Sequence, residues 1–359
     1  MEILTSRDNR WLKEFRVALR GGVAGEGGAV GVEGVRLVVE ALTSGCRVEA
    51  VLFSESGERY RERLAPLVGR REMAFPVLRT TDRLFEGIAD TEHPQGVAAL
   101  VVPRKWTLEE MLGGRGEGSL GSRSDHRPAT SDQEEQGQLE AGASKERQEA
   151  KGEILRAQTT RAQDDKQSVG SAEPLMVVLA GVQDPGNVGT ILRTAAAFGA
   201  TGAVTAATGQ SGTASPYAPK ALRASAGAAL HLPMVSGMAL GILLMQLKMR
   251  GILTLASCVE ESPAVAGNAK DGSPAGVSAQ AVAPWEIDWR QAIALLVGNE
   301  GAGLPEEVVK SADARVHIPM APLRYRSGTG RVESLNAAAA AAVVLYEGYR
   351  QRKAVGSGE

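Results

Sequence analysis

Residues 175–189 read LMVVLAGVQDPGNVG, and residues 293–303 read IALLVGNEGAG. Each stretch begins with a continuous apolar run, which is typical of a strand buried in a parallel sheet. Each run then passes directly into a loop of glycine and polar residues. Because parallel strands deliver the loops that follow them to one edge of the sheet, where ligands of α/β proteins bind, the two loops are expected to meet there.

The pattern of alternating strands and helices continues through residues 174–353. Asn187 is expected to cap the first helix of this region, and Gly199 to end it. Apolar runs predict further strands at 203–204, 230–235, 252–256 and 316–318, and helical periodicity predicts helices at 188–198, 237–250 and 336–352. This alternation favours an α/β domain with a mostly parallel sheet.

Residues 1–105 are expected to form a smaller α/β domain, with helices at 9–19 and 34–42 and strands at 48–53 and 96–102. Residues 106–173 are predicted to be a disordered linker. From about residue 113 they contain almost no aromatic or β-branched residues, so they cannot bury enough apolar surface to offset the entropy of ordering. A weaker alternative is an RNA-binding arm. Residues 259–283 are interpreted as a surface insertion, and residues 354–359 as a tail.

Composition and charge exclude several classes of protein. The 359 residues carry a formal net charge of -2, which gives no global sign of a nucleic-acid partner. Two distant cysteines, Cys46 and Cys258, exclude a disulfide framework or a cysteine-rich zinc site and fit a reducing cytoplasm. The four histidines are scattered, so no metal is expected. Without a signal peptide or an apolar run of about 20 residues, a cytoplasmic protein with no membrane partner is expected.

Asn187 and Arg193 are candidate functional residues at the first loop. Backbone N–H groups at the start of a helix point toward a bound anion. Arg193 follows six residues later, and arginine binds phosphate through its planar fork of donors. An ordinary helix cap and a surface arginine would explain the same two residues, so both interpretations stay open.

The second loop contains Gly298, Glu300 and Gly301. A glycine directly after a buried strand lets the backbone approach a ligand closely, and Glu300 is suited to accept hydrogen bonds from backbone or ligand donors. The glycines do not have the order of a dinucleotide fingerprint. A plain glycine-rich turn is the alternative interpretation.

A third group of candidates lies near the C-terminus. Ile318 and Met320 offer apolar contacts, while Ser334 and Asn336 flank the start of the last predicted helix. Helix capping by Ser334 is the alternative explanation for that residue.

Together, these three segments resemble the SpoU/TrmH family of RNA ribose methyltransferases, a branch of the SPOUT superfamily, over residues 175–349. The resemblance implies an α/β sheet whose C-terminal segment is threaded as a deep trefoil knot. It implies S-adenosylmethionine held in the knot, and methyl transfer to a ribose 2′-hydroxyl of RNA. It also implies a homodimer whose active site is built across the interface.

Carried over by position, the resemblance assigns roles to the motif residues. Arg193 matches the catalytic arginine of the family, and its expected role is to anchor phosphate and stabilise an alkoxide, since a guanidinium is too weak an acid to serve as a base. Two departures are the insertion at 321–330 and Ala196, where many relatives have an acidic residue. The implied catalytic set is Arg193, Asn187, Glu300, Ser334 and Asn336, and the implied cofactor-binding set is Gly298, Glu300, Gly301, Ile318, Met320, Ser334, Leu335 and Asn336.

The N-terminal domain is similar to the L30e-like substrate-binding extension of the same family, over residues 33–42 and 91–97. Basic residues from Arg7 to Arg20 recur every three or four positions, which predicts a basic stripe on one helix face. A solvated face is the alternative. The residues expected to contact RNA are Arg7, Arg10, Lys13, Arg36, Arg324, Arg326 and Arg331.

The leading hypothesis is a 2′-O-methyltransferase of 23S-type rRNA. A tRNA 2′-O-methyltransferase is the alternative within the same reaction class. A non-catalytic RNA-binding or ribosome-assembly protein with the same fold is the alternative from another class.

Overall fold

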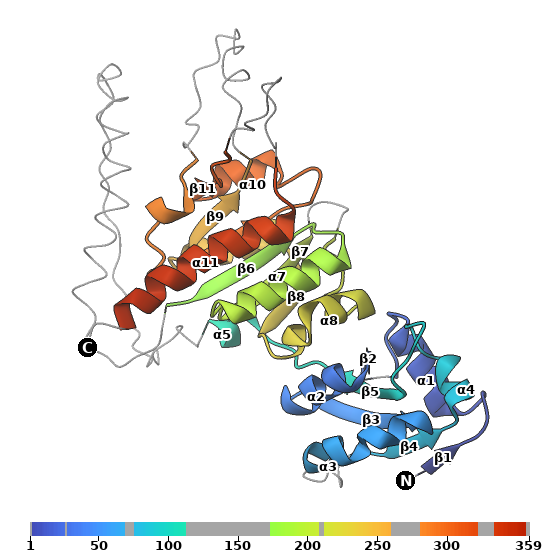
Figure 1. Cartoon of the computed structure of the whole chain (residues 1–359). Coiled ribbons are helices and arrows are strands. Elements are labelled where there is room, and N and C mark those ends of the chain that lie inside the picture. Colours follow the sequence, from blue (N-terminus) through green and yellow to red (C-terminus); the bar gives the residue numbers. More distant parts are fainter. Residues whose placement is uncertain are drawn as a thin grey trace, which may run out of the picture. The chain divides into compact units, whose positions relative to one another are not determined.

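The computed structural model describes residues 2–25, 27–68, 75–112, 173–207, 212–259, 281–321 and 334–356 of the chain, with side chains as far as Lys353. These residues form an N-terminal sheet and a C-terminal sheet, each covered by helices on both faces (Figure 1). No helix in these ranges combines the length and the apolar character that crossing a bilayer requires.

The N-terminal sheet is mixed and has five strands in the order β1-β4-β3-β5-β2. β1, β4 and β3 pair in parallel, whereas β5 runs antiparallel to both β3 and β2. The helices α1 and α4 pack on one face and α2 and α3 on the other. The strands are β1 (Glu2–Leu4), β2 (Val30–Glu33), β3 (Arg47–Ser54), β4 (Val77–Thr80) and β5 (Val97–Val102), and the helices are α1 (Arg10–Leu19), α2 (Val35–Thr43), the 3-10 turn η1 (Ser56–Tyr60), α3 (Arg61–Val68) and α4 (Asp82–Glu86).

The four elements predicted in this domain are confirmed to within one residue at each end. The two segments that carried its family resemblance also contact each other. Gln95 Oε1 accepts the backbone N–H of Val35 at 2.9 Å and so caps the start of α2. The carboxylate of Glu33 accepts the backbone N–H of Asp90 at 2.9 Å and the hydroxyl of Thr91. These bonds hold residues 90–97 against the first turn of α2.

The C-terminal sheet has six strands in the order β11-β9-β10-β6-β7-β8, and every pair is parallel. The prediction of a mostly parallel sheet is therefore confirmed. The central strands β6 and β10 are the two apolar runs that end in the candidate loops. The strands are β6 (Leu175–Ala180), β7 (Gly202–Ala207), β8 (Met234–Ala239), β9 (Leu253–Ser257), β10 (Ile293–Val297) and β11 (Ala314–Val316).

Helices cover both faces of this sheet, which explains why its strands are apolar at every position. In β6, Leu175 and Val177 face α7, α8 and α11, whereas Met176 and Val178 face α5, α9 and α10. The helices are α5 (Leu108–Met111), α7 (Pro185–Ala197), α8 (Pro219–Ser225), α9 (Leu240–Met249), α10 (Glu306–Ser311) and α11 (Ala337–Gly356), with 3-10 turns η2 (Ala228–Leu230) and η3 (Pro284–Glu286).

The predicted start of the first helix is wrong. Asp184, not Asn187, caps α7: its Oδ1 accepts the backbone N–H of Gly186 at 2.8 Å. Pro185 occupies the first helical position, where its fixed φ is favourable and its missing N–H costs nothing. Asn187 therefore lies inside the first turn. The predicted end at Gly199 holds, since this glycine has φ +75° just after the C-cap residue Phe198.

Three further predictions have shifted boundaries. The strand predicted at 230–235 is β8 at Met234–Ala239, and the helix predicted at 237–250 begins only at Leu240. Gly237 has φ +75° at an irregularity in the pairing of β7 with β8, so the strand continues past the glycine that was expected to start a helix. The strand predicted at 316–318 is β11, which ends at Val316.

The chain stays ordered beyond the predicted end of the N-terminal domain. Residues 106–112, counted above with the linker, include α5, which begins with a capping box between Thr107 and Glu110. Met111 fills the space above Gly202, where a Cβ atom would lie 2.2 Å from the Met111 sulfur. The remaining predicted linker (113–172), most of the insertion (260–280) and the end of the tail (357–359) lie outside the described residues.

The trefoil knot implied by the family resemblance stays a prediction. Residues 322–333, which connect β11 to α11, lie outside the described residues. They include most of the 321–330 insertion as well as Arg324, Arg326 and Arg331.

Candidate functional site

Glu300 joins the loops that follow β6 and β10. Its Oε2 accepts the backbone N–H of Gln183 at 3.1 Å, and its Oε1 accepts the backbone N–H of Asp184 at 3.0 Å. Oε1 also accepts the side-chain amide of Asn187 at 2.9 Å. The first and second candidate loops therefore meet at the C-terminal edge of the sheet, where adjacent parallel strands deliver them.

Asn187 connects this pair of loops to the start of α11. Its Oδ1 accepts a hydrogen bond from Nδ2 of Asn336 at 3.1 Å. Asn336 in turn caps α11, because its Oδ1 accepts the backbone N–H groups of Ala338 at 2.9 Å and Ala339 at 3.3 Å. The cap expected of Ser334 as an alternative is thus provided by Asn336. With both ends of its amide bonded, the Asn187 side chain is held in a single orientation.

Two carboxylates at this edge are held in the charged form. Burial by itself would raise the pKa of Glu300, but the hydrogen bonds from Asn187, Asp184 and Gln183 outweigh it and leave the pKa below its ordinary value. The ammonium of Lys220, 2.7 Å from Asp184 Oδ1, and the N–H of Gly186 lower the pKa of Asp184. Lys220 was not among the residues predicted from the sequence.

The glycines after β10 are required by close backbone packing. A Cβ atom on Gly298 would lie 2.4 Å from the carbonyl carbon of Gly303, so no side chain fits there. Asn299 and Gly303 exchange two backbone hydrogen bonds of 3.0 Å, and Gly303 has φ +69°. Asn299 Oδ1 accepts the backbone N–H groups of Gly301 and Ala302, both at 2.9 Å. These hydrogen bonds close residues 299–303 into a rigid, ring-shaped loop, which together with Gly298 is named the glycine ring.

A cavity of about 380 Å³ opens beside this ring. Its walls are mostly apolar residues from the sheet and from α11, and Ser257, Asn299, Glu300 and Ser334 are polar residues of the lining. Seven predicted residues line it: Gly298, Glu300, Gly301, Ile318, Met320, Ser334 and Leu335. The inner face of α11 contributes Ala337, Ala340, Ala341 and Val344.

Sequence reasoning missed one wall of the cavity. Ser257, Cys258 and Val259, at the C-terminal end of β9, also line it. The strand was predicted, and β9 lies next to β10 in the sheet. The rule that ligands bind at the carboxyl ends of parallel strands would have pointed to these residues.

Three predicted site residues, Asn187, Arg193 and Asn336, are not part of the described lining of the cavity, although Asn187 binds the lining residue Glu300. Arg193 is exposed on α7 and makes no hydrogen bond or ion pair within the described part of the chain. In the described ranges, no three His, Cys, Asp or Glu side chains gather in a way that suits a metal ion.

The predicted basic stripe of the N-terminal domain is interrupted. Arg7 precedes α1 rather than lying on it, while Arg10 pairs with Glu14 at 2.7 Å and Lys13 with Asp8 at 3.2 Å. Arg36 is exposed in the first turn of α2. The charge available to a phosphate backbone is therefore smaller than the count of basic residues indicates.

Comparison with known sequences divides the chain into two matched regions. Residues 174–346 match the model of the SpoU rRNA Methylase family, and residues 26–99 match the MRM3-like substrate binding domain. A Synechocystis protein named an uncharacterized tRNA/rRNA methyltransferase is 36% identical over 178 residues, which are 50% of this chain and 54% of that protein. The Bacillus subtilis 23S rRNA (guanosine(2553)-2′-O)-methyltransferase RlmP is 31% identical over 182 residues, 50% of this chain and 60% of that protein. The chain thus spans little more than half the length of these relatives.

Solved structures share the fold over nearly the whole chain. An AdoMet-bound rRNA methyltransferase from Sinorhizobium meliloti superposes with a TM-score of 0.62 at 22% identity, covering 97% of each chain. The SpoU methyltransferase AviRb from Streptomyces viridochromogenes, in complex with AdoMet, gives a TM-score of 0.62 at 22% identity, covering 98% of this chain and 100% of AviRb. The chain therefore shares the fold of these methyltransferase structures, and residues 174–346 belong to the SpoU rRNA methylase family, preceded at residues 26–99 by an MRM3-like substrate-binding domain.

Proposed function

We propose that the chain is an S-adenosylmethionine-dependent methyltransferase that acts on a ribose 2′-hydroxyl of RNA, with 23S-type rRNA as the substrate class. One observation carries the proposal. Residues of the loop at 298–303 and of the segment near the C-terminus, Ile318 to Leu335, line the same cavity within the region that matches the SpoU family. The name of RlmP, a 23S rRNA 2′-O-methyltransferase, supports the choice of substrate. The AdoMet complexes of two structures with the same fold support the choice of methyl donor.

The residues lining the cavity fit this donor. At about 380 Å³ the cavity is of the size that small-molecule ligands occupy. Apolar walls from Leu295, Val316, Ile318 and Leu335 suit the face of an adenine ring, and the exposed residues 300–303 offer polar groups to its edge and ribose. When bound, S-adenosylmethionine supplies a methyl group on a positively charged sulfur.

The chain's own residues then have two tasks, positioning and charge stabilisation. A neutral ribose hydroxyl is a poor nucleophile, so a nearby positive charge that favours its alkoxide form accelerates attack. Arg193 carries that charge, and its planar guanidinium suits binding of the substrate phosphate. Ser334 lies in the cavity lining, where its hydroxyl can orient the ribose.

Asn187, Glu300 and Asn336 serve as a fixed frame for this arrangement. Three N–H donors already occupy the Glu300 carboxylate, which therefore acts as an anchor for the loop after β6 rather than as a proton acceptor. The two asparagines transmit that anchoring to the start of α11. Preorganised frames of this kind contribute to catalysis by holding reacting groups in line.

A homodimer is part of the proposal. Val343 and Tyr346 on α11 are 46% and 53% exposed, although both are large and apolar. The rings of Phe198 and Tyr346 contact each other with centroids 5.6 Å apart, so α7 and α11 lie side by side. A second copy covering this pair of helices would bury the apolar residues and would bring Arg193 to the interface.

The test is transfer of labelled methyl groups from S-adenosylmethionine to purified 23S rRNA, 16S rRNA and tRNA, followed by mapping of 2′-O-methyl positions. The proposal predicts 2′-O-methylation of 23S rRNA. It also predicts that Arg193→Ala abolishes transfer, while Arg250→Ala, on the opposite face of the sheet, leaves it unchanged. Binding of RNA without transfer by the folded dimer would instead favour a non-catalytic RNA-binding protein, and labelling of tRNA alone would overturn the substrate class.

A further inference from the structure

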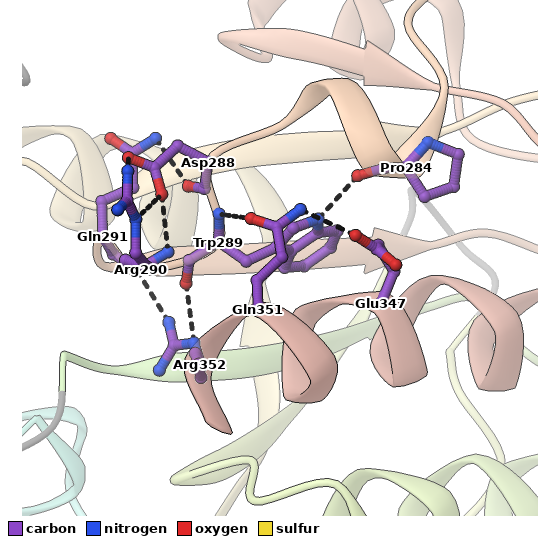
Figure 2. A network of polar contacts seen from close by, with 8 residues as sticks. All are labelled: Pro284, Asp288, Trp289, Arg290, Gln291, Glu347, Gln351 and Arg352. Carbon is purple, nitrogen blue, oxygen red and sulfur yellow. Dashed lines mark hydrogen bonds and ion pairs between the residues drawn. The ribbon is translucent and has the colours of Figure 1, made fainter. Parts of the chain in front are cut away.

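A half-buried arginine near the end of α11 binds the chain just before two central strands. Figure 2 shows its contacts with Trp289 and Gln291, which precede β10. Arg352 Nε donates to the carbonyl oxygen of Trp289 at 2.7 Å, and Nη1 donates to that of Glu173. Nη2 donates to the carbonyl oxygens of Gln291 at 2.7 Å and Pro174 at 3.2 Å. Residues 173–174 immediately precede β6, and residues 289–291 precede β10. One side chain therefore connects a helix end to the starts of both strands.

Only an arginine can make this set of contacts. Its planar guanidinium presents five N–H donors in a fixed fork, of which four are used here. Desolvation holds the pKa of Arg352 below its usual value, and the charges of Glu173 and Asp288 partly offset that effect. A lysine at this position would carry the charge but would lack the geometry to bind four carbonyl oxygens in two chain segments.

Trp289 provides a second fixed point beside this arginine. Its side chain is fully buried, its Nε1 donates to the carbonyl oxygen of Pro284 at 2.8 Å, and its backbone N–H donates to Oε1 of Gln351 at 3.2 Å. The indole lies against Gly348 of α11, where a Cβ atom would be 2.8 Å from ring atom Cε3. The helix therefore reaches this position only because residue 348 is glycine.

The two ends of α11 are fixed by polar contacts of different kinds. At its N-terminal end Asn336 binds Asn187, and at its C-terminal end Arg352 binds the strand starts. The rise from Asn336 to Arg352, 16 positions along the chain, is about 24 Å of helix. Between these ends Ala338, Ala341, Val344 and Leu345 are buried, so apolar packing holds the helix against its neighbours. The end contacts add directional hydrogen bonds that oppose sliding of the helix along its axis.

The same helix forms one wall of the cavity, through Ala337, Ala340, Ala341 and Val344. We propose that Arg352 is a positioning residue: by fixing the far end of α11, it sets the position of that wall and of Asn336, and thereby the affinity of the cavity for the nucleoside part of the methyl donor. The identity of the ligand rests on the proposed function, whereas the positioning of α11 does not.

The test uses the full chain and three variants, Arg352→Met, Gly348→Ala and Arg350→Met. Arg350 is a matched control, because it is an exposed arginine of the same helical turn that pairs with Glu347 rather than with the chain before β6 and β10. Two quantities are measured at a temperature at which each variant is folded. One is the dissociation constant of S-adenosylhomocysteine, and the other is the hydrogen-exchange rate of the amides in the first turn of α11.

Arg352→Met and Gly348→Ala are expected to weaken S-adenosylhomocysteine binding by about tenfold or more, equivalent to about 1.4 kcal/mol. Both should also accelerate exchange at Ala338 and Ala339, while Arg350→Met changes neither quantity. Parental exchange rates at these amides in both folded variants would overturn the proposal. If the parent chain itself does not bind the ligand, the proposed function fails, and the exchange comparison still decides the positioning role. Should Arg352→Met fail to fold, Gly348→Ala provides the same test with the arginine in place.

Discussion

Asn187 and Asn336 are 149 residues apart in the chain, and their side-chain amides are joined by a hydrogen bond of 3.1 Å. This contact connects the start of α7 to the start of α11. Because Glu300 holds the other end of the Asn187 amide, three motifs that are separate in sequence form one rigid edge of the site. The predictions that follow test this edge, the cavity beside it and the proposed interface.

Replacing Glu300 by glutamine should weaken the edge without removing the side chain. A neutral amide has one acceptor oxygen where the carboxylate has two, so at least one of the N–H donors from Gln183, Asp184 and Asn187 loses its partner. We expect the free energy of unfolding to fall by about 1–2 kcal/mol. Urea denaturation measures this change, and Glu307→Gln on the exposed start of α10 is the control. Equal stability of the two variants would contradict the anchoring role of Glu300.

Stability should also depend on pH through the same carboxylates. The folded-state pKa values of Glu300 and Asp184 lie below their ordinary values of 4.5 and 3.8, so both groups stabilise the fold above those values. That contribution is lost as the pH falls through the lower folded-state values. Urea denaturation at a series of pH values should therefore show declining stability below about pH 4.5. The decline should be smaller in Glu300→Gln, and an identical decline in this variant would refute the assignment to Glu300.

Gly298→Ala should distort the glycine ring beside the cavity. The new Cβ atom would lie 2.4 Å from backbone of Gly303, so the loop has to move. Overpacking of this kind costs about 1–3 kcal/mol. A lower melting temperature and a loss of S-adenosylhomocysteine binding are the expected results. Gly241→Ala in α9 is the matched control, since no atom lies within 4 Å of its new Cβ, and it should retain both properties.

If the proposed dimer interface is correct, a charge placed on its apolar face should convert the dimer to a monomer. Val343→Asp places a carboxylate in the surface that a second copy would cover, and an unpaired buried charge opposes association. Sedimentation velocity should show a dimer for the parent chain and a monomer for this variant. Ile242→Asp on α9, where the replaced residue is also exposed, should remain dimeric. A parent chain that is monomeric, or a dimer unaffected by Val343→Asp, would rule out this interface.

Much of the sheet could be predicted from the sequence because its signals are local. Strands β6 and β10 are continuous apolar runs, and continuous burial on both faces requires such runs. The predicted start of α7 was wrong because Asp184 and Asn187 are both residue types that cap helices well. Pro185 at the first helical position decides in favour of Asp184. The predicted end of this strand at residue 235 was wrong, because the pairing of β8 with β7 sets the backbone conformation of Gly237 and carries the strand past it.

The site likewise contains some residues that local motifs indicate and some contacts that depend on the folded chain. Gly298, Ile318 and Leu335 were recognised because their motifs are short and specific, and all three line the cavity. The contact of Glu300 with Asn187 depends on the separation of two strands in space, which spacing along the chain does not give. Arg352 had no signal in the sequence, because its partners are backbone carbonyls, which every residue possesses.

The most direct test of the central claim is calorimetric titration of the parent chain and of Gly298→Ala with S-adenosylmethionine and with S-adenosylhomocysteine. The account predicts saturable binding of both ligands to the parent chain, at one site per chain, and loss of both in the variant. Absence of binding to the folded parent chain, or equal binding by the variant, would contradict the assignment of the cavity to the methyl donor.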